Sequence, residues 1–330
     1  MSSRSSQKRI WISWENQRRS VELSKSFNCS NFIIIEKGYL RYLLSIIKTF
    51  KIIQHEKPDV LFVQNPSIIL AFFATCVFKY IFKYFVVVDR HSNFLLVDKR
   101  RNFLFEIIFH FISYLTIRFS DLTIVTNIEL FNVVDVLGGR ASILPDKIPS
   151  IIPSKNGIKL VGDKNILIIS SFADDEPIQE IVLATDYFTN DSIIFYFSGD
   201  FNKYSNVNQL KSRKNIVTTG FIDEQDFVDI VFSVDIVIVL TTMKYTLLCG
   251  CYEAIAAGKV LITSDTITLR SLFDGAIFVQ NKYESITGAI QYSLDHTDII
   301  KERINELKNS MQIKWESQYN EINDKILKYT

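Results

Sequence analysis

The stretch DIVIVLTTMKYTLLCGCYEAIAAGKVLITSD, residues 235–265, decides the fold class of this chain. It opens with a continuous run of β-branched and apolar residues, which predicts a strand buried on both faces. Small and apolar residues over 247–257 then predict a helix that ends at Gly258, and VLITSD predicts another buried strand. A strand, a helix and a second strand in this order form a βαβ unit of a parallel sheet.

The same alternation repeats along both halves of the chain. In the first half, segments with helical spacing separate the strand-like runs RIWIS, NFIIIE, DVLFVQ, YFVVVD, LTIVT and ASILPD. In the second half, the strand-like runs are NILIIS, IIFYFSGD, NIVTTGF, DIVIVLT, VLITSD and IFVQN. Between Pro145 and Gly162 this periodicity is lost and three of the six prolines occur, which is typical of a linker.

These patterns predict an α/β protein with two Rossmann-like doubly wound domains that face a cleft. We place the first domain at residues 1–155 and the second at 156–305. Residues 306–330 are expected to form a helix that packs back on the first domain. In doubly wound sheets, ligands bind beyond the carboxyl ends of the strands, so we look for the site there.

Charge is divided unevenly between the two halves. Of the 330 residues, 48% are hydrophobic and 22% are charged, which is the composition of a folded chain. Residues 1–155 hold 21 Lys and Arg against 12 Asp and Glu, a net charge of +9, which leaves −8 for the remainder. A basic half favours phosphates or an anionic membrane as partners, although a chance imbalance of surface residues gives the same numbers.

The cysteines and the N-terminal residues indicate a cytoplasmic protein. Four cysteines in a chain of this length are too few for a disulfide framework. The first fifteen residues are polar and basic and lack the apolar core of a signal peptide. The apolar stretch 67–88 contains two lysines, so we interpret it as a helix followed by a buried strand and not as a membrane span.

Metal and nucleic-acid sites are not expected. Cys249 and Cys251 form a C-x-C pair, but a zinc site needs about four ligands and no second pair lies nearby. We interpret Asp174 as a helix cap, with Asp175 and Glu176 in the first turn of that helix. No Walker loop, nucleophile elbow or G-x-G-x-x-G is present, and no basic stripe interleaved with aromatics indicates nucleic acid.

The order of several short motifs carries a family resemblance. RRSVELSKSF, KPDVLFVQNPSIIL, SSFADDEPIQEIVLAT, FYFSGD, NIVTTGF and YEAIAAGKVLITSD follow one another as they do in GT-B glycosyltransferases of the family-4 type. VVDRHSNF, SDLTIVTNIEL and ILPDKIPS resemble loops of the β-mannosyltransferases that act on lipid-linked chitobiose. The resemblance implies a transferase that uses a nucleotide-diphosphate sugar as donor, with no metal and no other cofactor.

Two segments depart from the family pattern. Tyr245 stands where retaining family-4 enzymes usually have the first glutamate of an E-x7-E pattern. SFADDEP is acidic where those enzymes usually have an arginine and a lysine that hold the diphosphate. The stereochemical outcome and the phosphate contacts therefore stay open.

The second domain is expected to bind the donor. By resemblance, Glu253 binds the nucleotide ribose; otherwise it stabilises the first turn of its own helix. The amides at the start of that helix suit a diphosphate. Ordinary turns explain Gly199 and Gly220 almost as well as close approach to a ligand does. A solvated surface charge explains Lys244 better than a ligand contact does. The predicted donor-binding residues are Glu253, Thr241, Thr242, Thr246, Leu247, Leu248, Ser171, Phe172, Gly199, Gly220 and Lys244.

The first domain is expected to hold the catalytic base and the acceptor. Asp89 and His91 end a buried strand, and one of them could take a proton from an acceptor hydroxyl, although Asp-x-His is also an ordinary loop pattern. Arg18 and Arg19 either meet a diphosphate on the acceptor or simply begin a helix. The predicted catalytic residues are Asp89, His91 and Glu15, and the predicted acceptor-binding residues are Asn16, Arg18 and Arg19.

Two segments of the first half combine aromatic and basic residues. Residues 39–56 contain Arg41, Lys48 and Lys51, and residues 99–119 begin with three consecutive cations. Such helices suit the surface of an anionic membrane, although a core-facing stripe explains most of their apolar residues. We expect contact with the inner face of the membrane, which a lipid-linked acceptor requires.

The sequence thus predicts a hexosyltransferase that uses a nucleotide sugar and acts on a lipid-linked or glycan acceptor in surface polysaccharide biosynthesis. Two alternatives stay open. A nucleotide-sugar epimerase can share the two-domain form, and a GT-B protein without activity can bind a partner or glycan.

Overall fold

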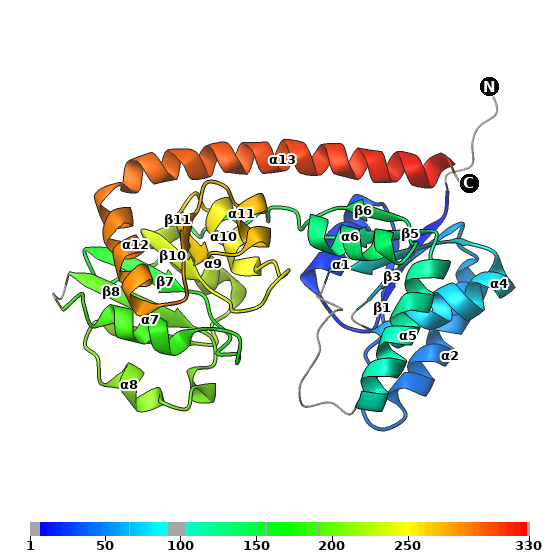
Figure 1. Ribbon diagram of the computed structural model, residues 1–330, viewed down its shortest axis with the longest axis horizontal. Coiled ribbons are helices and arrows are strands. Elements are labelled where there is room, and N and C mark those ends of the chain that lie inside the picture. Colours follow the sequence, from blue (N-terminus) through cyan, green and yellow to red (C-terminus); the bar gives the residue numbers. More distant parts are fainter. Residues whose placement is uncertain (1–6, 66, 92–102, 156, 190–191, 329–330) are drawn as a thin grey trace. The chain divides into compact units, whose positions relative to one another are not determined.

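The structure is a computed structural model, and it describes residues 7–65, 67–91, 103–155, 157–189 and 192–328 (Figure 1). It divides into two compact units. Unit 1 consists of the described residues up to Asp146 and from Trp315 onward, and unit 2 spans Lys147–Lys314. Unit 2 thus begins earlier than the boundary near residue 155 that we predicted. The reason is that Ile148 lies in the core of unit 2 and the Ser154 amide donates to the Asp229 carboxylate at 2.7 Å.

Unit 1 contains a parallel sheet of six strands in the order β2-β1-β3-β4-β5-β6. The strands are β1 (Arg9–Ser13), β2 (Ser30–Ile33), β3 (Val60–Gln64), β4 (Phe85–Arg90), β5 (Leu122–Val125) and β6 (Ala141–Ile143). Every residue of β3 is buried, as expected for a central strand with both faces covered. The chain order reverses between β1 and β3, so the carboxyl ends of these strands mark the place where such sheets bind ligands.

Helices cover both faces of this sheet (Figure 1). The helical segments of unit 1 are α1 (Arg18–Ser26), α2 (Arg41–Glu56), α3 (Ile68–Phe72), a π-helix (Phe73–Phe78), α4 (Lys79–Phe82), α5 (Phe103–Phe119) and α6 (Ile128–Val136). Ile10 and Ile12 pack in one hydrophobic cluster and Trp11 in another, because neighbouring side chains of a strand point to opposite faces. None of the helices within the described residues is long and apolar enough to span a bilayer.

Unit 2 repeats the plan with strand order β12-β11-β10-β7-β8-β9. Its strands are β7 (Lys164–Ile168), β8 (Ile193–Ser198), β9 (Ile216–Gly220), β10 (Ile236–Val239), β11 (Val260–Ser264) and β12 (Ile277–Val279). Its helices are α7 (Ile178–Thr185), a 3-10 turn (Phe201–Lys203), α8 (Val207–Lys211), α9 (Glu224–Ser233), α10 (Cys249–Ala256), α11 (Ile267–Leu272) and α12 (Tyr283–Asp295). The reversal of chain order here lies between β7 and β10, so their following loops are the expected ligand-binding loops.

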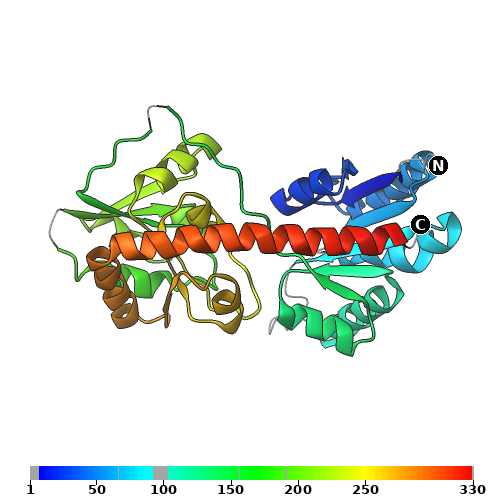
Figure 2. The same cartoon turned by 90° about the horizontal axis from the view of Figure 1, so that it is seen from above.

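The chain ends in helix α13 (Thr297–Lys328), which is drawn as one unbroken helix in Figure 2. Its apolar residues recur at helical spacing: Ile300 and Ile304 lie in the core of unit 2, whereas Trp315 and Ile322 lie in a core cluster of unit 1. The Trp315 indole donates to the carbonyl oxygen of Pro145 at 3.0 Å. The terminal helix therefore begins nine residues before the predicted start at 306, and only its later part belongs to unit 1.

Candidate active site

A buried ion-pair network lies at the carboxyl end of β4 in unit 1. Arg19 on α1 donates through Nε and Nη2 to the Asp89 carboxylate at 2.8 to 3.1 Å. Its Nη1 donates to Asp146 at 2.6 Å, and its Nη2 also donates to the Leu144 carbonyl oxygen at 2.8 Å. On the other side of Asp89, the Nδ1 of His91 lies 2.9 Å from Oδ2. Three of the predicted site residues, Arg19, Asp89 and His91, thus form one cluster.

The charges in this cluster fix the tautomer of the His91 imidazole. Burial alone raises the pKa of Asp89, but Arg19 and His91 outweigh burial and lower this pKa to about 2. An ionised carboxylate only accepts hydrogen bonds, so Nδ1 of His91 carries the proton that it shares with Asp89. When the imidazole is neutral, its Nε2 is therefore the nitrogen with a lone pair. The His91 side chain is 15% exposed, whereas that of Asp89 is fully buried.

The structure changes our interpretation of Arg19. Its side chain is 6% exposed and is enclosed by Asp89, Asp146 and the backbone of Leu144. A guanidinium bonded in this way holds carboxylates of its own unit, which does not fit the predicted contact with an acceptor diphosphate. Burial lowers the pKa of Arg19, but the two carboxylates outweigh burial and raise it, so the charge is permanent.

The other acceptor-side candidates lie at the carboxyl end of β1. Glu15, Asn16 and Arg18 are all exposed, and the Glu15 carboxylate accepts from Gln17 Nε2 at 2.9 Å. β3 lies between β1 and β4 in the sheet. Glu15 and Asn16 therefore share the sheet edge with Asp89 and His91 but lie in the loop after β1, and Arg18 is the first residue of α1.

In unit 2, the loops after β7 and β10 are tied together by Asp175. The Thr241 hydroxyl donates to the Asp175 carboxylate at 2.7 Å, and the Thr242 amide donates to the Asp175 carbonyl oxygen at 2.7 Å. Thr241 is fully buried and also accepts from the Met243 amide at 3.1 Å. The structure thus brings the predicted residues Thr241 and Thr242 to the reversal point of the sheet, where Thr241 supports the loop.

Glu176 has a role that we did not predict. Its carboxylate accepts from the amides of Ser171 and Phe172 at 2.9 to 3.1 Å and from the hydroxyls of Ser170 and Ser171. Phe172 has a φ of 56°, a left-handed conformation that turns successive amides toward one anion. In the loop between β7 and α7, a carboxylate of the protein itself therefore occupies the kind of amide nest that often binds a phosphate.

The predicted helix cap in this segment is wrong. Helix α7 begins at Ile178, its N-cap is Pro177, and no side chain bonds to the cap. Asp175 and Glu176 precede the helix because their carboxylates find hydroxyl and amide donors in neighbouring loops. Those direct hydrogen bonds outweigh the weak attraction of a helix dipole for a negative charge.

Gly199 and Gly220 close the same edge of the sheet. The Gly199 amide donates to the Gly220 carbonyl oxygen at 3.2 Å, which joins the ends of β8 and β9. Gly199 has a φ of 91°, and a Cβ there would lie 2.1 Å from the Ser170 carbonyl oxygen. Glycine is required at this position by the protein backbone itself, which favours the turn interpretation over contact with a ligand.

Helix α10 carries Glu253 at the same reversal point. It begins at Cys249, two residues later than predicted, so Thr246, Leu247 and Leu248 belong to the loop before it, as does the exposed Lys244. Glu253 lies in the second turn and not in the first, and it is half-buried between buried neighbours. Residues 249 and 253 are one turn apart and share the outer face of the helix. Tyr245 adopts a φ of 61°, which is strained for an aromatic residue.

The two cysteines of α10 differ in exposure: Cys249 is exposed and Cys251 is buried. Burial raises the pKa of Cys251 to about 12, so its thiol stays protonated. Among the described residues, no group of three or more His, Cys, Asp and Glu side chains is arranged to hold a metal ion. The structure also assigns Gly250 to packing, because a Cβ there would press on Val239 and Ile169 at 3.0 to 3.1 Å.

Three carboxylates of these networks were missed or misassigned from the sequence. Asp146 lies in a segment that we interpreted as linker, and Asp175 and Glu176 lie in one that we interpreted as a helix start. The available signal was their position: Asp146 is the last residue of the predicted strand ASILPD, and Asp175 and Glu176 follow the predicted strand NILIIS by five and six residues. Their partners are distant in sequence, so only the fold identifies the pairs.

Comparison with known proteins identifies the fold. A scan against protein-family models and a search of curated proteins both find no match. Sucrose-phosphate synthase from Thermosynechococcus elongatus is similar in structure, with a TM-score of 0.75 and 10% identity over 96% of this chain and 98% of that one. HepE from Anabaena in complex with UDP has a TM-score of 0.67 and 11% identity over 98% and 99% of the two chains.

A glycosyltransferase from Rickettsia africae is a third similar structure, with a TM-score of 0.68 and 13% identity over 98% of this chain and 91% of that one. These likenesses extend over both units and helix α13. Together with two six-stranded parallel sheets, each wound on both faces, they show that the chain has the GT-B fold.

Proposed function

We propose that this protein is a glycosyltransferase that moves a hexose from a nucleotide sugar to a hydroxyl of a lipid-linked or glycan acceptor during surface polysaccharide assembly. The observation that carries the proposal is His91, whose Nδ1 is held by the buried Asp89 carboxylate at the carboxyl edge of the unit 1 sheet. A histidine oriented by a carboxylate is the arrangement of a general base. The fold supports the same reading, since the similar structures include sugar transferases.

In the proposed reaction, His91 Nε2 accepts the proton of the acceptor hydroxyl. The oxygen attacks the anomeric carbon as the bond from that carbon to the nucleotide diphosphate breaks. Asp89 stays ionised and stabilises the imidazolium that forms, and Arg19 with Asp146 holds Asp89 in position. A single displacement of this kind inverts the configuration at the anomeric carbon, and it needs no carboxylate at position 245.

The donor is proposed to lie on the loops after β7 and β10 of unit 2. HepE was solved with UDP and with UDP-glucose, so a uridine nucleotide is the first candidate. Because Glu176 already fills the amide nest of Ser171 and Phe172, we assign the diphosphate to the loop Thr242–Leu248 and the start of α10. Glu253, half-buried on the outer face of α10, is assigned to the ribose hydroxyls.

Calorimetric titration with nucleoside diphosphates tests the donor site. We expect one nucleotide to bind, and Glu253→Ala to weaken that binding by about 10-fold or more, since one charged hydrogen-bond acceptor contributes about 1.5–3 kcal/mol. Glu306→Ala, at an exposed position of α13, is the matched control and should leave the affinity unchanged. Unchanged affinity in Glu253→Ala would remove this residue from the site.

The same titration separates the two alternative functions. If no nucleotide binds, both enzymatic functions fail and a non-catalytic binding protein remains. If a nucleotide binds and its sugar is transferred to water or an acceptor, a transferase is supported. Interconversion of two nucleotide sugars without transfer would instead identify an epimerase.

We also propose that unit 1 rests on the inner face of a membrane through residues 39–56 and 99–119. Leu104, Ile107, Ile108 and Phe111 of α5 are exposed, whereas Lys99, Arg100 and Arg101 lie outside the described residues. Exposed apolar side chains beside cations suit an anionic surface, with about 1 kcal/mol for each cation near it. Co-sedimentation with vesicles containing anionic lipid, but not with neutral vesicles, is the expected result. Equal amounts of protein in the supernatants of the anionic and the neutral vesicles would contradict the proposed membrane contact.

A further inference from the structure

The loop between β7 and α7 surrounds one carboxylate of the protein with hydrogen-bond donors. The amides of Ser171 and Phe172 donate to the Glu176 carboxylate at 2.9 to 3.1 Å, and the Ser171 hydroxyl donates to it at 2.8 Å. The Ser170 hydroxyl is a fourth donor. We call the segment from Ser170 to Phe172 the amide nest. Phosphate groups bind to the same kind of donor set, in which backbone amides and hydroxyls point at one anion.

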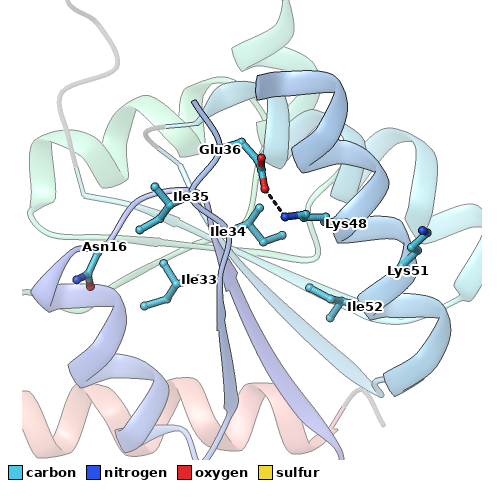
Figure 3. A pocket seen from close by; sticks show the side chains of 8 residues that line it. All are labelled: Asn16, Ile33, Ile34, Ile35, Glu36, Lys48, Lys51 and Ile52. Carbon is cyan, nitrogen blue, oxygen red and sulfur yellow. Dashed lines mark hydrogen bonds and ion pairs between the residues drawn. The ribbon is translucent and has the colours of Figure 1, made fainter. Parts of the chain in front are cut away.

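The carboxylate in the nest is held differently from two other carboxylates of the chain. Glu36 in unit 1 contacts Lys48, and the dashed line in Figure 3 marks this ion pair. Asp265 in unit 2 pairs with Arg270. Glu176 instead receives hydrogen bonds from uncharged amides and hydroxyls. Since these donors carry no formal charge, they leave the negative charge of Glu176 in place at this edge of the sheet.

The amide nest is accessible from solution. Ser171 is exposed and Glu176 is half-buried, whereas Ser170 and Phe172 are buried. Phe172 packs in the core of unit 2, so the core fixes the donors on one side while solvent reaches them on the other. A small anion can therefore reach these donors when no carboxylate fills the nest.

Glu176 is fixed in this place by its own neighbours. The Asp175 carboxylate accepts from the Thr241 hydroxyl at 2.7 Å, and the Asp175 carbonyl oxygen accepts from the Thr242 amide at 2.7 Å. The Glu176 amide donates to the Ala173 carbonyl oxygen at 3.0 Å. The backbone that carries the carboxylate is therefore bonded both to its own loop and to the loop after β10, which keeps the carboxylate in the nest.

The amide nest lies beside the loop to which we assign the diphosphate. β7 and β10 are neighbouring strands, so their ends lie about 4.8 Å apart. Gly250, in the first turn of α10, packs on Ile169, because a Cβ at residue 250 would lie 3.1 Å from that side chain. Ile169 directly precedes the nest. A phosphate at the start of α10 is therefore close to the Glu176 carboxylate, and two negative charges at close range repel each other.

We propose that Glu176 is a specificity-determining residue of the donor site, and that it excludes phosphate groups from the amide nest. The nest has the geometry of a phosphate site, and Glu176 closes it. Nucleotide phosphates then bind only on the side of α10, and inorganic phosphate and pyrophosphate, which lack a nucleoside, are rejected. The inference rests on the proposed transferase function and deepens it, because it states which ligands the donor site refuses.

Calorimetry on the full chain with inorganic pyrophosphate tests this exclusion. Glu176→Ala should bind pyrophosphate at least about 10-fold more tightly than the parent, because four donors are then available and one negative charge is gone. Glu176→Gln removes the charge but keeps an oxygen that fills the nest, so its affinity should lie between the two. In NMR spectra, the amide signals of Ser171 and Phe172 should shift on addition of pyrophosphate in Glu176→Ala and stay in place in the parent.

Two matched controls separate the nest from general effects of charge and structure. Glu36→Ala removes one negative charge from unit 1. Glu180→Ala removes a carboxylate of α7 that also accepts from a backbone amide, that of Tyr283 at 2.8 Å. Both controls should stay within about threefold of the parent affinity for pyrophosphate, since the nest remains filled.

Several outcomes would overturn the proposal. Unchanged pyrophosphate affinity in a folded Glu176→Ala would show that the carboxylate only supports the loop, and an equal gain in Glu180→Ala would show a general charge effect. If Glu176→Ala does not fold, Glu176→Gln decides, because it has nearly the same shape as the parent residue. Equal pyrophosphate affinity of Glu176→Gln and the parent would then reject the exclusion.

The outcome is independent of the nucleotide titration, because pyrophosphate contains no nucleoside. A gain of pyrophosphate binding in Glu176→Ala, with no nucleotide bound by the parent, would uphold the closed nest and reject the transferase. Nucleotide binding and sugar transfer by the parent, with no gain of pyrophosphate binding in Glu176→Ala, would reject the exclusion alone.

Discussion

Replacing His91 by alanine is expected to lower kcat by about 10²- to 10⁴-fold, the usual contribution of a positioned general base. The imidazole is partly exposed and is oriented by Asp89, so its loss removes the proton acceptor and leaves the fold intact. Nucleotide affinity should be unchanged, since the donor site is assigned to unit 2. Single-turnover rates with the nucleotide sugar found by titration give the measurement.

Two controls make this result specific. His55→Ala removes a histidine of unit 1 that is 86% exposed and pairs only locally with Glu56, and its kcat should equal that of the parent. NMR of the product should give the inverted anomer; retention would contradict the direct displacement that we propose.

Replacing Arg19 by methionine is expected to lower the free energy of unfolding by about 3–5 kcal/mol, the cost of leaving a buried carboxylate without its counter-ion. Asp89 is fully buried, and Arg19 is the cation that bonds to both of its oxygens. Arg19→Lys keeps the charge but loses the fork of donors, so it should be intermediate. Urea denaturation followed by circular dichroism measures the differences.

The pH dependence of this difference follows from Asp89. Its pKa in the folded protein is about 2, below the ordinary 3.8, so its contribution to stability is fully present above about pH 4 and is lost as the pH falls toward 2. The difference in the free energy of unfolding between the parent and Arg19→Met should therefore become smaller as the pH falls.

The double variant Arg19→Met with Asp89→Leu should be more stable than Arg19→Met alone, since it leaves no unpaired charge at position 89. A gap that is constant with pH, or a double variant that is the least stable, would contradict this account.

Much of the fold could be predicted because it follows from local patterns. Twelve apolar runs separated by helical segments predicted two doubly wound sheets, and the structure has six strands in each. The strands were easy to identify in the sequence, because parallel strands are buried on both faces and are therefore continuous apolar runs. Helix starts were less predictable. Helix α7 begins three residues later than expected, since Asp175 and Glu176 before it bond to hydroxyls and amides of neighbouring loops. Helix α10 begins two residues later than expected.

The candidate site was predictable only in outline. Asp89 and His91 were identifiable as polar residues at the end of a buried strand, and the position of a strand end is a local property. The role of Arg19 was not identifiable, because its partners Asp89 and Asp146 are 70 and 127 residues away. The same holds for Glu176, whose negative charge resembles a helix start until the amides of Ser171 and Phe172 are seen around it.

The sequence by itself therefore determined the two-unit α/β architecture and the strand ends at which polar residues gather, because periodicity and propensity act over a few residues. Only the tertiary structure decided which charges are buried and paired, and which apolar side chains stay exposed between Ile33 and Ile47. Burial depends on what packs against a residue, and that partner comes from elsewhere in the chain. For this reason the Arg19 side chain is buried in unit 1, while Ile33 and Ile35, in a segment that the sequence predicts to be a strand, are exposed.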